Sequence, residues 1–241
     1  MELQPNPRKN LIIELDGNPS TGSGSRRFAR YAVKTKLITP EDKDISLIVR
    51  QYVLEYLLPE DIVFVSEKAV AVTQCRSYHL DSIKPSKMAR LLSKYVTKTP
   101  IGIGLGSPQT MQLAIEEVGI LRILFSAFFG VIFKLFGIKG IFYILAGDKA
   151  RSIDGAVPYA IPPYNKYVSK GPINANEVAK KISDRLGGVK VAIVDANDIG
   201  VNILGSTPGL DRKFVARAIK DNPLGQTDEC TPVGIIREIK T

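Results

Sequence analysis

The chain has 241 residues, a composition close to that of average globular proteins, and a formal net charge of +9. That length buries a core without disulfides or a structural metal, and the composition excludes collagen-like, coiled-coil and wholly disordered proteins. One histidine and two cysteines exclude His-rich metal centres and Cys-rich zinc sites. Any metal would be held mainly by oxygen, which favours magnesium, calcium or manganese.

The excess of basic residues, 33 against 24 acidic ones, is compatible with nucleic acid, anionic lipid or a polyanionic ligand such as a nucleotide. Alternatively, it only affects solubility. The densest basic cluster, Arg26, Arg27 and Arg30, has no interleaved aromatic residues of the kind that RNA-binding surfaces use. We therefore expect no nucleic acid as a partner. We expect no membrane partner either, because we expect the apolar segment 118–136 to lie in the core or in an oligomer interface.

The N-terminal part predicts an appendage to a larger domain. Residues 1–10 are polar and have no signal-peptide features, which points to the cytoplasm, where thiols stay reduced. Residues 11–15 predict a strand before a Gly/Ser-rich turn at 18–25. We expect residues 1–28 to form an extension or opening hairpin, and residues 29–241 to form the main domain.

Alternation of apolar and polar residues predicts a strand over 31–38, and Pro40 then opens a helix. The first turn of that helix is rich in acidic residues, as the helix dipole favours. These residues are Glu41, Asp42 and Asp44.

A buried strand over 62–65 is followed directly by Ser66, Glu67 and Lys68. Polar side chains at the carboxyl end of a strand are a common ligand site in α/β sheets. The alternative is an ordinary junction between strand and helix, with Ser66 as the N-cap.

The next segments predict helices over 86–96 and 108–118, the second with Ser107 as N-cap and Pro108 at its first position. The glycine-rich stretch 100–110 matches neither a Walker loop nor a dinucleotide fingerprint. It could bind an anion through its amide groups, or simply allow close packing.

Residues 118–136 are strongly apolar but are interrupted by Arg122 and Lys134. A membrane-spanning helix needs about 20 apolar residues, more than this stretch provides. We expect a buried core helix or an oligomer interface; the alternative is a helix that docks on a membrane surface or a partner, because basic residues flank the apolar run.

The last third predicts two more buried strands that each end in acidic residues. One strand runs into Asp148, and the other, over 189–200, ends in Asp195, Asn197 and Asp198. The remaining expected elements are a helix at 174–187, a basic helix within 207–220, a polar loop at 221–232 and a strand at 233–239.

A carboxylate at the end of a buried strand must be hydrogen-bonded, neutralised or bound to a cation. If one sheet brought Asp148 and Asp195 together, a divalent cation between them would relieve their repulsion, as in sites for metal-chelated nucleoside triphosphates. The alternative is that each aspartate only caps the following turn.

Several segments, in this order and spacing, resemble the F420-0:gamma-glutamyl ligase family. They are residues 33–44, 58–76, 146–155, 162–163, 191–198 and 201–205. The resemblance implies an α+β fold with mixed sheets and flanking helices, in a protein that forms homodimers. It also implies a ligase that uses GTP and manganese or magnesium to join glutamate to a carboxylate on the phosphorylated tail of a deazaflavin cofactor.

The resemblance also assigns roles to single residues. Asp148 and Asp195 match positions that hold metal, with Asp198 as an additional acidic candidate. Ser66 and Lys68 match the family segment that follows a buried strand and lies on the side of the nucleotide. Together with the polar run after the strand, we expect Ser66, Glu67, Lys68 and Asn197 to bind the nucleotide.

The chain departs from the family pattern at a few positions. Ala196 replaces a threonine, Asp198 a glycine, Ile199 an arginine and Val72 a lysine. The arginine would be a bidentate clamp for phosphate or carboxylate. The alternative function is therefore a diverged protein that binds nucleotide and metal without ligase activity.

Overall fold

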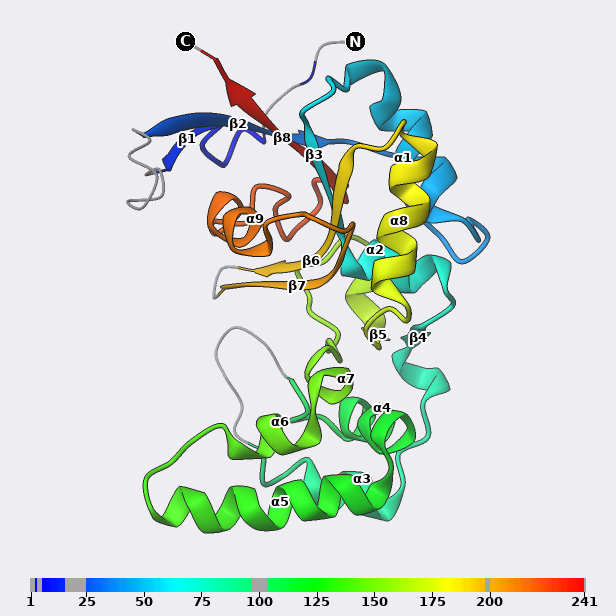
Figure 1. The fold of residues 1–241 in the computed structure, drawn as a ribbon. Helices are drawn as coiled ribbons and strands as arrows, with labels where there is room; N and C mark the ends of the chain where they lie inside the picture. The colour runs from blue at the N-terminus through cyan, green and yellow to red at the C-terminus, as the bar shows by residue number, and fades with distance from the viewer. Residues whose placement is uncertain (1–2, 4–5, 16–24, 97–103, 198–199, 241) are drawn as a thin grey trace. The chain divides into compact units, whose positions relative to one another are not determined.

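A computed structural model describes the chain except for residues 1–2, 4–5, 16–24, 97–103, 198–199 and 241 (Figure 1). The chain forms two compact units. Unit 1 consists of Met1–Gln74 and Pro172–Thr241, and unit 2 consists of Cys75–Gly171. Each unit is described by itself below.

Unit 1 contains a six-stranded mixed sheet in the order β1-β2-β8-β3-β6-β7. β3 and β6 are parallel, and the other neighbouring pairs are antiparallel. The predicted α+β class with a mixed sheet and flanking helices is confirmed. The strands are β1 (Ile12–Leu15), β2 (Arg26–Val33), β3 (Ile62–Ser66), β6 (Lys190–Asn197), β7 (Gly200–Ser206) and β8 (Val233–Ile239).

Helices cover both faces of this sheet. On one face, Phe64 and Val194 pack with Val215 and Ile219 of the α9 region. Because side chains alternate along a strand, the neighbouring residues of β3 and β6 face the opposite side, where α8 lies against β6 and β7 (Figure 1). The helices of unit 1 are α1 (Ile45–Val53), α2 (Glu67–Thr73), α8 (Ala175–Arg185) and α9 (Arg212–Ala218), with a 3₁₀ turn at Leu54–Tyr56.

Two close approaches hold the layers together. A Cβ atom on Gly205 of β7 would lie 2.3 Å from the carbonyl carbon of Ala175 in α8. A Cβ atom on Gly234 of β8 would lie 2.2 Å from the ring of Phe64, which is opposite Gly234 in the sheet. At both positions any side chain would displace its neighbour.

The first helix of unit 1 begins later than Pro40 predicts. α1 begins at Ile45, because the Asp44 carboxylate accepts a hydrogen bond from Ser46 N at 3.1 Å and caps the helix there. Asp42 instead accepts a hydrogen bond from Thr39 N at 2.8 Å and closes a turn before the helix. The strand expected at 31–38 lies earlier, as β2.

The basic cluster near the N-terminus is part of the unit's framework. The Arg30 side chain is 1% exposed and forms an ion pair with Asp221. It also donates a hydrogen bond to Ala218 O at 3.0 Å. Arg26 forms a second pair with Glu238 on β8, so two of the three arginines hold carboxylates of their own chain.

Unit 2 is mainly helical. Its core includes Leu105, Met111, Ile123, Ala146 and Val168, which are almost completely buried. Ser107 and Thr110 form a capping box at the start of α4, with Pro108 at the first position, as the sequence predicts. The helices are α3 (Lys87–Leu92), α4 (Pro108–Val118), α5 (Ile120–Leu135), α6 (Ile141–Ala146) and α7 (Asp148–Arg151); β4 (Ser77–His79) and β5 (Tyr167–Ser169) pair, with 3₁₀ turns at Leu80–Ser82 and Tyr164–Lys166.

Two sequence-based expectations for unit 2 are wrong. The apolar run before Asp148 is not a strand but the helix α6, and Asp148 itself begins α7. Short apolar runs do not distinguish strand from helix, and here Gly140 and Gly147, at φ 88° and 86°, delimit α6. The apolar helix α5 is not a core helix either, because only Ile123 and Ser126 are buried along it. The other expectation for this segment, an oligomer interface, stays a prediction.

Among the described helices, none alone has the length and apolar composition needed to cross a bilayer. α4 and α5 meet that criterion only when taken together, and the chain bends by 116° between them.

The two ends of unit 2 are fastened by polar contacts. Arg76 donates to Gly171 O at 2.7 Å and pairs with Glu117 at 2.8 Å. Lys170 lies 3.4 Å from the same carboxylate. Just outside, within unit 1, the Gln74 side chain donates to Ile173 O and accepts from Ile173 N, at 3.0 and 2.9 Å.

Candidate functional site

The parallel register of β3 and β6 brings two groups of predicted site residues to one edge of the unit 1 sheet. Ser66, the last residue of β3, lies opposite Val194 on β6. Asp195 and Asn197 follow Val194 on the same strand, and Lys68 follows Ser66 on α2. The carboxyl ends of parallel strands thus meet at the place where α/β sheets commonly bind ligands.

Two further segments reach this edge. Ser66 N donates a hydrogen bond to Pro232 O at 2.8 Å, and Thr35 N donates one to Cys230 O at 3.0 Å. Lys34, which is exposed, directly follows the last residue of β2. Sequence reasoning missed Lys34 and Thr35, because pairing of β2 with the distant β8 places them here.

The polar run after β3 is not a simple helix cap. Ser66 stands at the N-cap position of α2, but its side chain makes no capping hydrogen bond. Glu67 is 5% exposed, and Lys68 is half-buried. The expected alternative, in which the Ser66 hydroxyl caps the helix, is not what the structure shows.

Asp195 and Asn197 point to one face of the sheet, since they lie two residues apart on β6. Ala196 between them packs on the opposite face, with the α9 cluster. Asn197 Oδ1 accepts a hydrogen bond from Gly200 N at 3.1 Å, and its Nδ2 donates to Asp195 Oδ1 at 3.5 Å. Both side chains are half-buried, and Asp198 lies outside the described residues.

Asp148 is in a different setting. It is the first residue of the four-residue helix α7 in unit 2, and its side chain is 95% exposed. Its carboxylate lies 3.6 Å from Arg151 one turn later. The physical argument that placed it at the end of a buried strand therefore does not hold, and its metal role stays a prediction from the family pattern.

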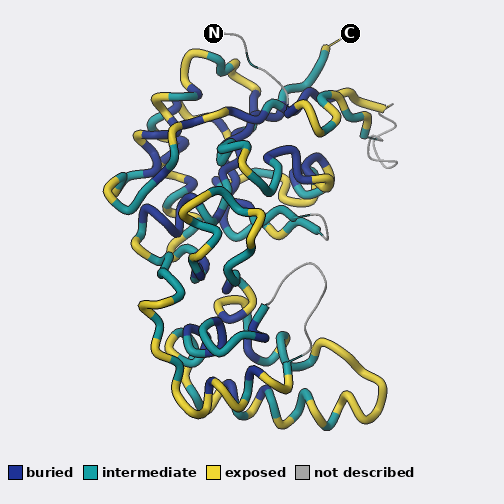
Figure 2. Tube along the Cα trace, turned by 180° about the vertical axis from the view of Figure 1, so that it is seen from behind, coloured by how far each residue is buried: buried dark blue, intermediate teal, exposed yellow. Residues whose placement is uncertain are grey.

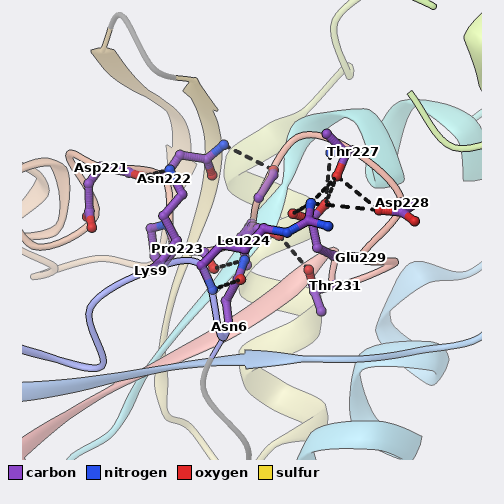
Figure 3. Close-up of polar contacts among 12 residues, drawn as sticks. Asn6, Lys9, Asp221, Asn222, Pro223, Leu224, Thr227, Asp228, Glu229 and Thr231 are labelled. Carbon is purple, nitrogen blue, oxygen red and sulfur yellow. Dashed lines mark hydrogen bonds and ion pairs between the residues drawn. The ribbon is translucent and has the colours of Figure 1, made fainter. Parts of the chain in front are cut away.

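The polar loop 221–232 is ordered by its own side chains and by the N-terminal segment (Figure 3). Asn6 donates to Pro223 O at 3.2 Å, and Arg8 donates to Thr227 Oγ at 2.9 Å. Thr227 N donates to Glu229 Oε2 at 2.8 Å. These contacts shape the segment that ends beside Ser66.

Two ionisable side chains near the end of this loop, Asp228 and Cys230, have shifted pKa values. A hydrogen bond from Thr227 lowers the pKa of Asp228, and the charges of Arg8 and Lys34 act in the same direction. Burial raises the pKa of the Cys230 thiol, against the opposing charge of Lys34. The thiol therefore stays protonated at neutral pH, which makes it a poor nucleophile.

The described residues contain no group of three or more His, Cys, Asp or Glu side chains able to hold a metal. A cage built from these four kinds of side chain is therefore not present in that part of the chain. Asp195 nevertheless suits magnesium or manganese, which are often bound through one or two carboxylates and completed by substrate phosphates and water.

Comparison with known proteins agrees with these features. The family model described as F420-0:Gamma-glutamyl ligase matches residues 32–199. The match runs from β2 through β3, α2 and the whole of unit 2 to the end of β6. No curated protein matches the chain closely enough to count as a relative. Because the matched region covers more than half of the chain, the protein belongs to the F420-0:gamma-glutamyl ligase family.

Proposed function

We propose that this protein joins glutamate to a carboxylate on the tail of a phosphorylated deazaflavin cofactor, with GTP as co-substrate and manganese or magnesium as the metal. The observation that carries the proposal is the register of β3 and β6. It sets Ser66 opposite Val194, so the nucleotide-side residues and Asp195 share one edge of the sheet.

The reaction needs two steps. A carboxylate oxygen of the acceptor attacks the γ-phosphorus of GTP, and GDP leaves. The amino nitrogen of glutamate then attacks the activated acyl carbon, phosphate leaves, and the nitrogen loses a proton. Both steps gather negative charge on phosphate oxygens, so positioning and cationic groups supply most of the catalysis.

The residues at the sheet edge suit those needs. Lys68 and Lys34 supply positive charge near the edge, and the Ser66 hydroxyl supplies a donor that is not used to cap α2. The net charge of +9 favours approach of phosphorylated substrates.

Asp195 would hold the metal, with Asn197 positioning its carboxylate through the 3.5 Å contact. A bound divalent ion would neutralise phosphate charge during transfer.

The departures from the family pattern next to Asp195 are compatible with this function. Ala196 stands where the family pattern has a threonine, but it packs into the α9 cluster on the other face of β6. The face that carries Asp195 and Asn197 is therefore unchanged by that substitution. The replacement of arginine by Ile199 lies outside the described residues.

Calorimetric titration with GTP and manganese, together with mass spectrometry of the glutamate-dependent product, tests the proposal. We expect Asp195→Ala to weaken binding of the metal–nucleotide complex about tenfold or more and to abolish the product. Asp184→Ala is the matched control, because Asp184 is an exposed carboxylate on α8 in the same unit. It should leave both measurements unchanged.

Three outcomes separate the alternatives. Binding without any glutamate-dependent product would identify a diverged relative that does not ligate. Absence of binding by the wild-type protein, or unchanged binding by Asp195→Ala, would refute the proposed site. Asp148→Ala, measured in parallel, tests the metal role that the family pattern assigns to Asp148; a loss equal to that of Asp195→Ala would establish it.

A further inference from the structure

The outward side of α5 carries a continuous row of large apolar side chains, which we call the α5 face. Its members are Leu121, Phe125, Phe128, Ile132 and Leu135, spaced by four, three, four and three residues. That spacing places them along one side of a helix. Four of the five are strongly exposed: Leu121 at 81%, Phe125 at 54%, Phe128 at 62% and Leu135 at 82%.

The opposite side of α5 already anchors the helix to unit 2. Ile123 and Ser126 are completely buried, and Ser126 Oγ donates to Arg122 O at 2.7 Å. A Cβ atom on Gly130 would lie 3.0 Å from Phe142 Cβ, so α6 packs closely there. The fold of unit 2 therefore does not require the α5 face to be covered by its own chain.

The apolar surface is wider than the face itself. Val131 is 55% exposed beside it, and the chain after α5 adds Phe136 at 77% and Ile138 at 46%. Among the described residues, half of the exposed large hydrophobic side chains lie between Leu121 and Ile144. Figure 2 shows this exposure along α5 and the segment that follows it. Soluble monomers rarely expose contiguous apolar patches of this kind without a binding role.

The charges around the patch are of one sign. Residues 118–147 contain Arg122, Lys134 and Lys139 and no acidic residue. All three basic side chains are exposed. Basic residues beside an exposed apolar helix face add electrostatic attraction to anionic lipids; the nearest acidic residues in the sequence are Glu116, Glu117 and Asp148, just outside the segment. A second copy of this face would bring more cations and no carboxylate from this segment to pair with them.

We propose that the α5 face docks on the surface of an anionic lipid bilayer, with the helix lying in the interfacial plane. The phenylalanines and leucines would enter the boundary between headgroups and acyl chains. Lys134 and Lys139 would contact lipid phosphates, whereas the Arg122 guanidinium donates to Leu145 O at 2.9 Å within unit 2. The expectation that a membrane is not a partner rested on placing this helix in the core or in an oligomer interface, and the structure does not place it in the core.

The absence of tryptophan from the chain permits a direct test. Phe128→Trp puts the only tryptophan on the α5 face, and Leu47→Trp puts it on α1, where Leu47 is 50% exposed; excitation at wavelengths beyond the tyrosine absorption band avoids the tyrosines. With vesicles of phosphatidylcholine and phosphatidylserine, we expect a blue shift and quenching by brominated lipid for Phe128→Trp only. No spectral change at position 128, or equal changes at both positions, would refute the proposal.

Vesicle co-sedimentation of the full chain gives the matching affinity measurement. Phe128→Glu should reduce partitioning about tenfold or more, because it removes a phenylalanine from the apolar contact and adds a charge that anionic lipid repels, whereas Leu47→Glu should leave partitioning unchanged. Circular dichroism confirms that each variant is folded. Equal binding to pure phosphatidylcholine would contradict the role of the cations. A soluble dimer that Phe128→Glu dissociates, without vesicle binding, would assign the face to a second copy and overturn the proposal.

Discussion

Unit 1 and unit 2 each contain an arginine that forms an ion pair with a carboxylate, but the two arginines connect different parts of their units. Arg30 lies inside unit 1, 1% exposed, and ties β2 to the segment after α9 through Asp221. Arg76 lies at the entrance of unit 2, 16% exposed, and ties the two ends of that unit together through Glu117 and Gly171. Unit 1 is thus held together from within, and unit 2 is closed at its ends.

The units also differ in how fully their helices are covered: among the described residues, α5 of unit 2 leaves a continuous apolar face open. In unit 1 the sheet has helices on both faces, and its glycines allow backbones to touch. In unit 2 the core is small, and α5 contributes only Ile123 as a fully buried apolar residue. A unit that is secured at its ends can present such a face to a partner. The following variants test the comparison.

The largest effect should come from the interior of unit 1. We expect Arg30→Ala to lower the free energy of unfolding by about 3 kcal/mol, because it removes a buried charge and leaves its partners without a donor. Asp221 is 44% exposed, so water compensates part of this loss. Arg26→Ala, which breaks an exposed pair with Glu238, should cost less than about 1 kcal/mol. Urea unfolding measures both.

Hydrogen exchange resolved by peptide would show where Arg30→Ala acts. Protection should fall in β2, β8 and α9 and persist in α4 and α5. A uniform loss of protection across both units would contradict the idea that each unit has its own means of support.

A smaller effect should come from the contact between β7 and α8. Gly205→Ala places a methyl group 2.3 Å from the backbone of Ala175, so α8 must shift. We expect a loss of about 1–3 kcal/mol of unfolding free energy, as for other overpacked sites. Gly200→Ala is the control, since a Cβ atom there meets nothing within 4 Å. Thermal unfolding of the two variants should separate them clearly; equal stability would show that the layers are looser than the structure indicates.

The smallest effect should come from the closure of unit 2. Burial alone would raise the pKa of the Glu117 carboxyl, but the hydrogen bond and charge of Arg76, with the charge of Lys170, hold it below its ordinary value. A lowered pKa in the folded state means that the stabilisation is present above the unfolded pKa of about 4.3 and is lost as pH falls through the folded pKa.

Glu117→Gln should cost about 1–2 kcal/mol at pH 7 and less near pH 3, below the ordinary carboxyl pKa of about 4.3, where protonation of this group in the unfolded chain offsets part of the stabilisation. Unfolding curves at the two pH values measure the difference. An equal cost at both pH values would show that the ion pair does not stabilise unit 2.

Local signals predicted much of the secondary structure. Ser107 and Pro108 predict the start of α4, and the apolar segment 233–239 after the polar loop predicts β8; both elements have those bounds. Predictions of this kind succeed because the interactions on which they depend lie within a few residues of one another. The prediction of a strand for the six-residue apolar run that forms α6 was wrong, because its composition suits either strand or helix.

Other features depend on contacts between distant segments. The burial of Arg30 requires Asp221, almost two hundred residues away, and no pattern near Arg30 indicates it. The meeting of Ser66 with the Asp195 strand requires parallel pairing of β3 and β6. The exposure of the α5 face could not be predicted from the sequence either. A periodic apolar pattern shows which residues share one side of a helix, but not whether another part of the protein covers that side.

Gln74 and Ile173 have a further consequence. Their two hydrogen bonds place the point where the chain leaves unit 1 within one side chain's reach of the point where it returns. Cys75–Gly171 is therefore an insertion between two neighbouring positions of unit 1. A few residues could bridge those positions in its place, because domain insertions and deletions are tolerated where chain ends lie close together. The sheet edge and the apolar helix could then vary independently, each on its own scaffold.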